Sequence, residues 1–216
     1  MTMRERLILV AAGGFGRELS FWAQDCQAAG TLPALAGYID DVVQELPGYD
    51  LPRLAGVQDY TPRSGDLFVV ALGCPAKKRR VVELLQARGA RFATLRHPTA
   101  TAVRTASIGE GVVMCPYTMA LADTRIERFA TLNNYSGLGH DSVCGEFTTL
   151  SSQVDVMGYA RIGKDVLIGS GARVLPKVTV GDGATIGAGS IVVRSVKPNM
   201  TVFAPPAKLL AMDAKA

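Results

Sequence analysis

Apolar residues recur at every sixth position over the second half of the chain. The position two residues earlier holds only small or β-branched residues, and the register never slips. An α-helix cannot carry this pattern, because its apolar stripe recurs at three and four residues and would drift away from a strict period of six. The apolar column consists of Ala102, Ile108, Met114, Ala120, Ile126, Leu132, Leu138, Cys144, Leu150, Val156, Ile162, Ile168, Val174, Val180, Ile186 and Val192.

The period of six predicts a β-solenoid. Short strands joined by tight corners, three to a coil, would place each apolar residue inside and each small residue at a corner. Each coil would bury its inner face by stacking on the next, and the stretch is long enough for roughly five coils, above the three or so that a stable stack needs. A glycine often follows the apolar position, where a chain turning a corner could use positive φ. These glycines are Gly109, Gly139, Gly145, Gly163, Gly169, Gly181 and Gly187.

The first part of the chain alternates buried apolar runs with helical spacing. Its pattern predicts strands at 6–12, 35–39, 66–72 and 91–95, and helices at 17–29 and 75–88. This order predicts a small parallel sheet of the doubly wound type, an α/β domain. The segment 45–63 is rich in proline and glycine and indicates an irregular connection. We therefore expect two domains, at residues 1–97 and 98–216.

Composition and charge narrow the function classes. The formal net charge of +4 is too mild and too dispersed to indicate nucleic-acid binding. The densest basic run, 77–80, indicates the solvated start of a helix, although it could still meet a phosphate. Four cysteines without paired spacing indicate a reduced protein. No signal peptide or membrane-spanning stretch is recognisable, so we expect a cytoplasmic protein that does not insert into a membrane.

Glycines and carboxylates gather where the front sheet would bind a ligand. In an open α/β sheet, ligands bind beyond the carboxyl ends of the strands. The residues predicted there are Gly13, Gly14, Phe15, Gly16, Asp40, Asp41 and Gly73. Leu19 stands where the third glycine of a dinucleotide fingerprint would be, so NAD is not expected, but one nucleotide would fit with its phosphates on helix-terminal amides. Alternatively, the glycines only form a tight strand-to-helix turn.

Several phrases of the sequence then point to one family. A strand that ends in AGGFGREL, a second that ends in DD, the stretch IGKDVLIGSGARVLPKVTVGDGATIGAGSIVV and the tail FAPPAKL together resemble the NeuD/PglD-type sugar acyltransferases. These are hexapeptide-repeat enzymes, and the resemblance covers nearly the whole chain. It implies a left-handed parallel β-helix behind a small Rossmann-like domain; the handedness comes from the resemblance alone, since parallel crossovers are normally right-handed.

The resemblance also implies a reaction. It implies an acetyl-CoA-dependent acetyltransferase that acts on an amino or hydroxyl group of a sugar, with a nucleotide-linked amino sugar held by the front domain. It further implies a homotrimer with active sites between neighbouring subunits. In that family His140 would be the general base and Asp141 would orient it, while Asn133 would shape the acceptor pocket. The backbone amide of Gly158, one coil after His140, would stabilise the oxyanion.

The residues alone leave some of these roles open. His140 follows a corner glycine and could be an idle surface histidine. His97 precedes a proline at the domain junction, where a structural or solvent-facing role is favoured.

The coenzyme would lie along the later corners. The resemblance implies that Ser170, Gly171, Ala188 and Gly189 hold the pantetheine arm and that Lys208 meets the adenine or the phosphates. Each of these could equally be an ordinary corner or a solvated lysine.

Two positions depart from the family pattern. Phe15 stands where many members have histidine, which leaves the acceptor undefined. Thr149 stands where members often have a second histidine that contacts the thioester carbonyl, and its hydroxyl could substitute.

Three other functions are weighed. O-acetylation of sialic acid or another free sugar is the closest alternative. A non-catalytic binding or scaffolding module is the second, suggested by Phe15 and Thr149. A zinc carbonic anhydrase on the same fold would need three histidine ligands, and the chain has two, so no metal is expected.

Overall fold

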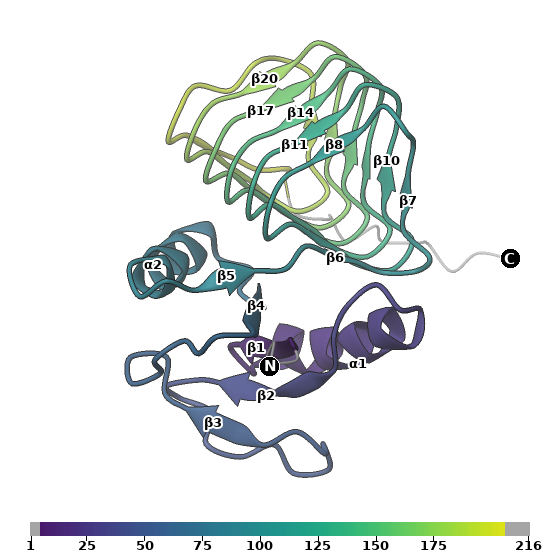
Figure 1. The fold of residues 1–216 in the computed structure, drawn as a ribbon. Helices are drawn as coiled ribbons and strands as arrows, with labels where there is room; N and C mark the ends of the chain where they lie inside the picture. The colour runs from purple at the N-terminus through teal and green to yellow at the C-terminus, as the bar shows by residue number, and fades with distance from the viewer. Residues whose placement is uncertain (1–4, 206–216) are drawn as a thin grey trace, which may run out of the picture.

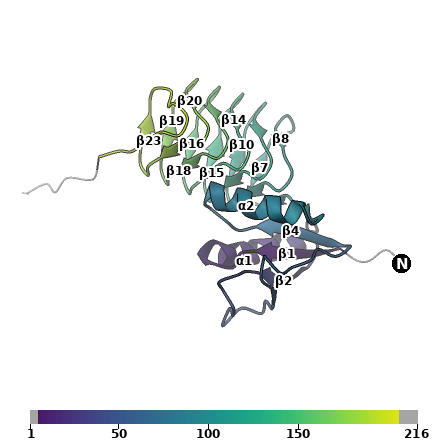
Figure 2. The same cartoon turned by 90° about the vertical axis from the view of Figure 1, so that its left-hand side faces the viewer.

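The computed structural model describes residues 5–205, which form a triangular column of short strands and a smaller α/β unit (Figure 1). The column stands over one side of the α/β unit. Figure 2 shows that the later coils, near β20 and β23, project past it. Among the described residues, no helix is long and apolar enough to cross a membrane.

The front unit is a five-stranded parallel sheet with one helix against each face. The strand order is β3-β2-β1-β4-β5. Its elements are β1 (Arg6–Val10), α1 (Gly14–Ala28), β2 (Leu35–Ile39), β3 (Arg53–Ala55), β4 (Asp66–Val70), α2 (Pro75–Gln86) and β5 (Arg91–Phe92). Alternate residues of β1 point to opposite faces, so Leu7 and Leu9 pack with α1, whereas Ile8 and Val10 pack with α2. The predicted parallel α/β sheet is confirmed, but β3 lies in a segment expected to be irregular.

The column consists of three parallel sheets, each of which is named here by its first strand. The β6 face contains β6 (Leu95–Arg96), β9 (Val113–Met114), β12 (Thr131–Leu132), β15 (Thr149–Leu150), β18 (Leu167–Ile168), β21 (Thr185–Ile186) and β23 (Thr201–Val202). The β7 face contains β7 (Thr101–Ala102), β10 (Met119–Ala120), β13 (Gly137–Leu138), β16 (Asp155–Val156), β19 (Arg173–Val174) and β22 (Ile191–Val192). The β8 face contains β8 (Ser107–Ile108), β11 (Arg125–Ile126), β14 (Val143–Cys144), β17 (Arg161–Ile162) and β20 (Thr179–Val180).

The predicted parallel solenoid and its register of six are confirmed. From β6 to β22, each strand pairs with the strand one coil later at an offset of eighteen residues, as in Leu138 opposite Val156, whereas Thr185 of β21 pairs with Thr201 of β23, sixteen residues later. The apolar column forms one core. The small column lies at the corners, where several of its hydroxyls donate to the carbonyl three residues earlier. Thr118, Thr124 and Ser142 make this bond at 2.9, 2.8 and 2.6 Å.

The explanation that the sequence suggested for the corner glycines is wrong. From Gly111 to Gly189 every sixth residue has positive φ, and this position lies two residues after the glycine column. The glycine column is instead required for the close approach of successive coils. A Cβ on Gly139 would lie 2.7 Å from the Gly158 nitrogen, and one on Gly169 would lie 2.5 Å from the Ala188 nitrogen. A side chain at either position would therefore push two coils apart.

The front unit packs against the first coils of the β6 face. A line of aromatic rings crosses this interface: Phe92 of β5 meets Phe129 edge-on at 5.1 Å, and Phe129 stacks on Phe147 at 5.0 Å. Both solenoid phenylalanines occupy positive-φ corners. A left-handed conformation costs about 1–2 kcal/mol for a residue with a Cβ, and the buried packing of these rings offsets it.

The change from one unit to the other occurs earlier than the sequence suggested. The predicted strand 91–95 is two strands: β5 belongs to the front sheet, and β6 already pairs with β9 of the column. The chain therefore changes sheets between Phe92 and Leu95, whereas the predicted boundary followed residue 97. The sequence did not reveal this break, because each strand contributes one buried apolar residue, Phe92 and Leu95, to what reads as one run.

One basic residue of α2, Lys78, is buried, contrary to expectation. Lys78 is 1 % exposed, and its Nζ donates to the Phe129 carbonyl at 3.0 Å and to the Thr131 and Thr149 hydroxyls at 2.8 and 3.0 Å. Burial lowers the pKa of Lys78 to about 7, because an ammonium group loses its water shell there. Lys78 thus joins α2 to two neighbouring coils.

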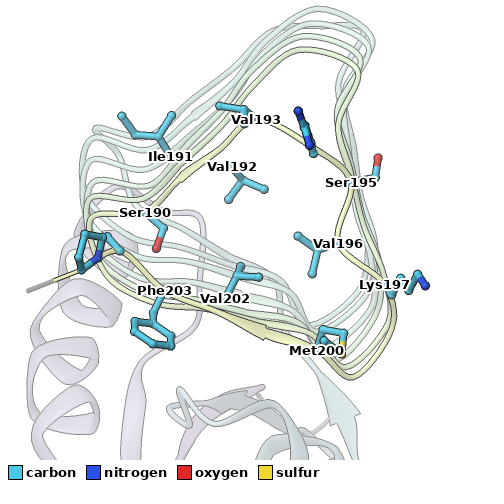
Figure 3. A pocket seen from close by; sticks show the side chains of 13 residues that line it. Ser190, Ile191, Val192, Val193, Ser195, Val196, Lys197, Met200, Val202 and Phe203 are labelled. Carbon is cyan, nitrogen blue, oxygen red and sulfur yellow. The ribbon is translucent and has the colours of Figure 1, made fainter.

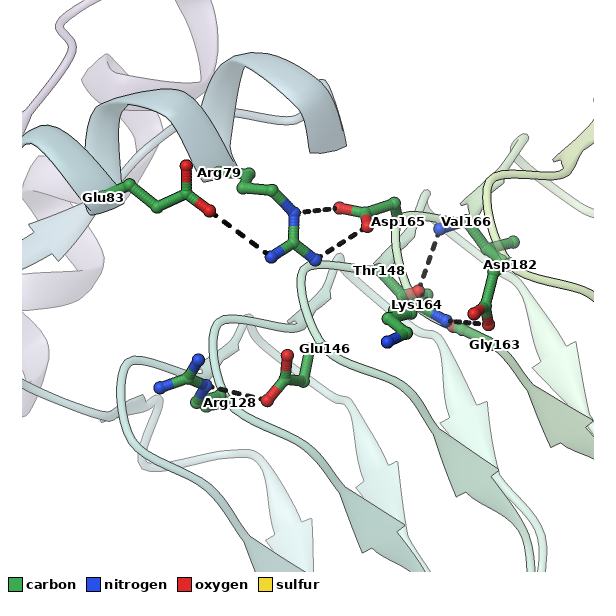
Figure 4. Close-up of polar contacts among 10 residues, drawn as sticks. All are labelled: Arg79, Glu83, Arg128, Glu146, Thr148, Gly163, Lys164, Asp165, Val166 and Asp182. Carbon is green, nitrogen blue, oxygen red and sulfur yellow. Dashed lines mark hydrogen bonds and ion pairs between the residues drawn. The ribbon is translucent and has the colours of Figure 1, made fainter. Parts of the chain in front are cut away.

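Arg79 makes the second polar contact between the units (Figure 4). Its guanidinium forms a bidentate pair with Asp165, at 2.9 and 2.7 Å, and lies 4.0 Å from the centre of the Phe147 ring. The bidentate geometry fixes orientation as well as distance. The orientation of α2 on the column is therefore defined by two side chains that follow one another in sequence.

Within residues 5–205, no segment covers the end of the inner column beyond the last coil (Figure 3). Val196 takes the inner position four residues after Val192, so the step of six is broken there. Val192, Val196 and Val202 line a mainly apolar depression of about 560 Å³. Lys208, predicted to meet the coenzyme, lies outside the described residues.

Candidate functional site

His140 lies at the corner between the β7 face and the β8 face, here called the His140 edge. Its Nδ1 lies 2.9 Å from the Asp141 carboxylate. Because an ionised carboxylate can only accept, Nδ1 carries the proton and Nε2 keeps a free lone pair in the neutral ring. The imidazole is 55 % exposed, so a substrate can reach it. This pair can accept a proton from a bound nucleophile.

Gly158 and Tyr159, one coil later, fix the position of the His140 ring. Tyr159 meets the ring edge-on, with centroids 5.0 Å apart. A Cβ on Gly158 would lie 2.6 Å from His140 Nε2, so only glycine leaves room for the ring in this position. Among the described residues, none accepts a hydrogen bond from the Gly158 N–H. The predicted base and the predicted oxyanion donor are thus adjacent.

The residues predicted to hold the coenzyme lie on another corner, between the β6 face and the β7 face. This corner, the Asn133 edge, carries Asn133, Ser170, Gly171, Ala188 and Gly189. Gly171 and Gly189 have φ of +70° and +68°, and a Cβ on either would meet no atom within 4 Å. The edge therefore presents exposed backbone with little side-chain cover. The structure brings these residues together, but not with His140 of the same chain.

Asn133 itself has a local partner. Its Oδ1 accepts a hydrogen bond from the Asn134 N–H at 2.7 Å. The side chain is only partly buried, which leaves its amide nitrogen available to a ligand.

The prediction for Thr149 is wrong. Thr149 lies on the β6 face, is 4 % exposed and has its hydroxyl in contact with Lys78 Nζ. The hydroxyl therefore cannot reach a thioester carbonyl. Thr149 departs from the family pattern, and this departure suggested a weakened site. The residue instead belongs to the contact between the two units.

The front sheet has a cavity of about 770 Å³ at the carboxyl ends of its strands. Gly13, Gly14 and Phe15 line it where α1 begins, and Asp40 and Asp41 line it after β2. The predicted position of the ligand site therefore coincides with a real cavity. The opening of an α/β sheet at this place suits a nucleotide.

Three predicted residues of this group have a different role. Gly16 is buried, and a Cβ there would overlap the Ala11 carbonyl oxygen, so it serves the packing of α1 on β1. Gly73 is exposed but does not line the cavity. Asp40 is 8 % exposed, and its carboxylate accepts bonds from the backbone N–H groups of Ala12, Val42 and Val43 at 2.7, 2.7 and 2.9 Å. Asp40 therefore holds the loops that form the cavity rather than offering a free carboxylate.

Two further residues of the cavity, Lys77 and Arg80 of α2, were not assigned to it from the sequence. They belong to the basic run that was expected to be solvated but was left open to contact with a phosphate, and both are exposed. Helical spacing could have identified them, since positions three apart share one face and the other two members of the run face away from it.

His97 has the structural role that was favoured. Its ring nitrogens lie 2.8 Å from Thr99 Oγ1 and 3.2 Å from Asp25 Oδ2, and the residue is 8 % exposed. Across residues 5–205, no group of three or more histidine, cysteine and acidic side chains is arranged to hold a metal ion.

Known proteins resemble this chain in sequence. Residues 159–194 match the family profile described as Bacterial transferase hexapeptide (six repeats). A GDP-perosamine N-acetyltransferase of Escherichia coli is 30 % identical over 168 residues, which span 76 % of this chain and 75 % of that protein.

Solved structures agree over almost the whole chain. The acetyltransferase domain of PglB from Neisseria gonorrhoeae, solved in complex with acetyl coenzyme A, has a TM-score of 0.83 at 29 % identity, covering 96 % of this chain and 100 % of that one. WeeI from Acinetobacter baumannii has a TM-score of 0.84 at 25 % identity, covering 95 % and 100 %.

Proposed function

This chain belongs to the hexapeptide-repeat sugar acyltransferases of the NeuD/PglD type, and within that family we propose that it acetylates the amino group of a nucleotide-linked sugar with His140 as the general base. It is an acetyl-CoA-dependent sugar acetyltransferase, as its relatives are. The observation that carries the proposal is the pair His140–Asp141 beside Gly158, where no residue in the range 5–205 forms a hydrogen bond with Nε2.

The chemistry follows from the two ring nitrogens. The acceptor amine attacks the thioester carbonyl carbon while His140 Nε2 removes its proton, and Asp141 stabilises the positive charge on the ring. The Gly158 N–H donates to the oxyanion of the tetrahedral intermediate. When the intermediate collapses, the C–S bond breaks, and the protonated ring returns the proton to the departing thiolate.

The acceptor is proposed to be nucleotide-linked because of the front cavity. Its volume of about 770 Å³ is much larger than a free hexose needs, and it lies where α/β sheets bind nucleotides. The relative at 30 % identity is named for a GDP-linked amino sugar.

Completion of the site requires a second copy of the chain. The His140 edge is the corner opposite the β6 face, which carries the front unit, so a ligand in the cavity would have to reach the histidine of a neighbouring chain (Figure 1). The bare β7 face supports such packing. Met119 and Ile191 are exposed on it, and exposed apolar residues flank it at both edges, namely Tyr117, Leu121, Tyr135, Tyr159 and Val193.

We therefore propose a homotrimer. Contact between the His140 edge of one chain and the Asn133 edge of the next joins two different surfaces. Such a heterologous contact closes only as a ring, and three columns around one axis make the smallest ring that leaves the front units outside.

A substrate panel tests the proposal. The full chain is supplied with acetyl-CoA and with GDP-, UDP- or dTDP-linked amino sugars, or with sialic acid and free amino sugars; released thiol is measured and the product is identified by mass spectrometry. We expect turnover with nucleotide-linked amino sugars, and His140→Ala should lower kcat by about 10²–10⁴-fold. Ala122→Ser, at the equivalent corner one coil earlier, is the control.

Each other result contradicts a part of the proposal. Turnover of free sugars alone favours the O-acetylation alternative. Binding of acetyl-CoA without any transfer favours the non-catalytic module. Unchanged turnover in His140→Ala removes the general base.

A further inference from the structure

Two tyrosines of the Asn133 edge combine an uncommon backbone conformation with an exposed ring. Tyr117 and Tyr135 have φ of +59° and +60°, and they are 54 % and 60 % exposed. Few bulky residues adopt such angles, because the Cβ crowds a neighbouring carbonyl oxygen. Phe129 and Phe147 adopt them as well, but those rings are buried against the front unit. In the described part of one chain, no comparable burial stabilises the two tyrosines, and an unexplained outlier of this kind points to a function.

The two tyrosine rings form a stack that runs along the column. Their centroids are 5.0 Å apart, and the angle between their planes is 9°. Because the two corners are one coil apart, Tyr117 covers one face of the Tyr135 ring, and the other face is turned toward the later coils. The equivalent corners there carry Gln153, Gly171 and Gly189 rather than a further ring. Tyr135 therefore ends a short aromatic platform on the side of the predicted coenzyme corners.

Tyr135 lies in the same coil as His140, on the other edge of the β7 face. In the proposed ring, the columns stand around an axis parallel to their length, so equal coils of the three chains lie at equal heights. The corners of Tyr135 and Asp141 differ by a third of a coil, which is about 1.6 Å along the column. Contact between the Asn133 edge of one chain and the His140 edge of the next therefore brings Tyr135 level with the neighbouring imidazole.

We infer that Tyr135 determines acceptor specificity, because its ring forms the surface on which the acceptor's sugar ring lies at the His140 site of the neighbouring chain. This inference rests on the proposed function, since it assigns the place of the sugar in that site. His140 removes a proton from an amino group on the sugar, so the sugar ring, rather than the nucleotide, lies beside the imidazole. The C–H groups of a sugar ring pack against an aromatic face. Tyr117 is a positioning residue, because its ring restricts the rotation of Tyr135.

Steady-state kinetics of the full chain test the role of the ring. The acceptor is the GDP-, UDP- or dTDP-linked amino sugar that is turned over, and it is varied at saturating acetyl-CoA. Tyr135→Gly removes the ring, and glycine is favoured at positive φ, so the corner keeps its shape. This variant should raise the KM for the acceptor by about tenfold and leave the KM for acetyl-CoA within about twofold. Tyr135→Phe keeps the ring and should keep the KM.

A matched control separates the ring from the relief of backbone strain. Lys177→Gly makes the same change at a corner with φ of +64° on the His140 edge, two coils after Asp141. It should leave the KM for the acceptor within about twofold. Light scattering of each variant should show the same assembly as the unmodified chain.

Mixed assemblies test whether the ring and the base come from different chains. His140→Ala chains and Tyr135→Gly chains are co-expressed with different tags and purified through both tags. Where the imidazole of a Tyr135→Gly chain meets the ring of a His140→Ala chain, the site has both groups, so part of the turnover should show the unmodified KM. If the two groups came from one chain, each site would lack one of them, and no such turnover would appear.

Four results overturn the inference. The first is an unchanged acceptor KM in Tyr135→Gly. The second is an equal rise of KM in Tyr135→Phe, because the hydroxyl rather than the ring would then contact the acceptor. The third is dissociation of the Tyr135→Gly assembly, because the ring would then serve the contact between chains. The fourth is a mixed assembly without turnover at the unmodified KM.

The inference and the proposed function can fail separately. If nucleotide-linked amino sugars are acetylated and Tyr135→Gly keeps the KM for them, the inference is wrong and the function stands. If only free sugars are acetylated and Tyr135→Gly raises the KM for them, the aromatic surface stands and the proposed acceptor is wrong.

Discussion

The two edges of the β7 face have the same backbone conformation, but one presents side chains and the other presents backbone at its later corners. At the His140 edge, the surface is formed by side chains: an imidazole, its carboxylate partner and the ring of Tyr159. At the Asn133 edge, the later corners expose glycine and alanine, so the backbone itself is the surface. Between Gly111 and Gly189, a residue with positive φ recurs at every corner of both edges. A repetitive fold thus supplies equivalent positions, and function arises from which residue occupies each.

The largest loss of activity is expected from substitutions that prevent the His140 edge of one chain from contacting the Asn133 edge of the next. Met119→Glu combined with Ile191→Glu places two charges on the β7 face, and burial of unpaired charges opposes association. We expect monomers by light scattering and a loss of turnover of about 10²-fold or more, comparable to removal of the base. Thr179→Glu, on the β8 face, should leave both unchanged; a monomeric double variant with full activity would contradict the shared site.

The next largest effect is expected from a substitution at Gly158, which tests whether the position of the His140 ring matters for activity. Gly158→Ala places a Cβ 2.6 Å from His140 Nε2 and forces the ring away. We expect kcat to fall by about 10–100-fold with little change in KM, since a small misplacement of a reacting group has effects of this size. If the methyl group acts through the ring, adding Gly158→Ala to His140→Ala should cause no further loss.

A smaller effect is expected at the Asn133 edge. Ala188→Gln covers exposed backbone with a longer side chain, which should raise the KM for acetyl-CoA by about tenfold, equivalent to one lost hydrogen bond, and leave kcat within about twofold. Initial rates at varied acetyl-CoA and fixed acceptor measure this. A fall in kcat at unchanged KM would instead assign this corner to the chemical step.

The smallest effect concerns Asp141. The pair with His140 is exposed, at 55 % and 40 % of the two side chains, so water screens it. Asp141→Ala should therefore lower kcat by only about three- to tenfold. Asp141→Asn should be worse, because an amide that donates to Nδ1 would put the ring proton on Nε2; equal losses would argue against the assigned tautomer.

The solenoid could be predicted because an apolar residue recurs at every sixth position through many coils. The inner column from Ala102 to Val192 is apolar at each step, and each strand depends only on its neighbours one coil away. The front sheet could be predicted less fully: β3, with the sequence RLA, has no periodic signal of its own.

The contact between the units could not be predicted from pattern. Burial of Lys78 depends on carbonyl and hydroxyl oxygens from residues 51 to 71 positions away in sequence, which a local pattern does not contain. For the same reason Thr149 was assigned to coenzyme binding. The position of His140 at a corner was predictable from the register, but the need for glycine at 158 becomes visible only when the next coil is stacked on it.

The close stacking of coils through the glycine column has a consequence for how such a chain can change its length. An insertion of one residue would turn every later side chain out of its face, and an insertion of six would move each later strand onto the next face. Within the regular coils that precede β22, a gain or loss of eighteen residues, one full circuit, keeps all three faces aligned. The regular part of the column can therefore grow or shrink only in whole coils, and each coil inserted after Gly158 would lengthen the Asn133 edge without moving the imidazole.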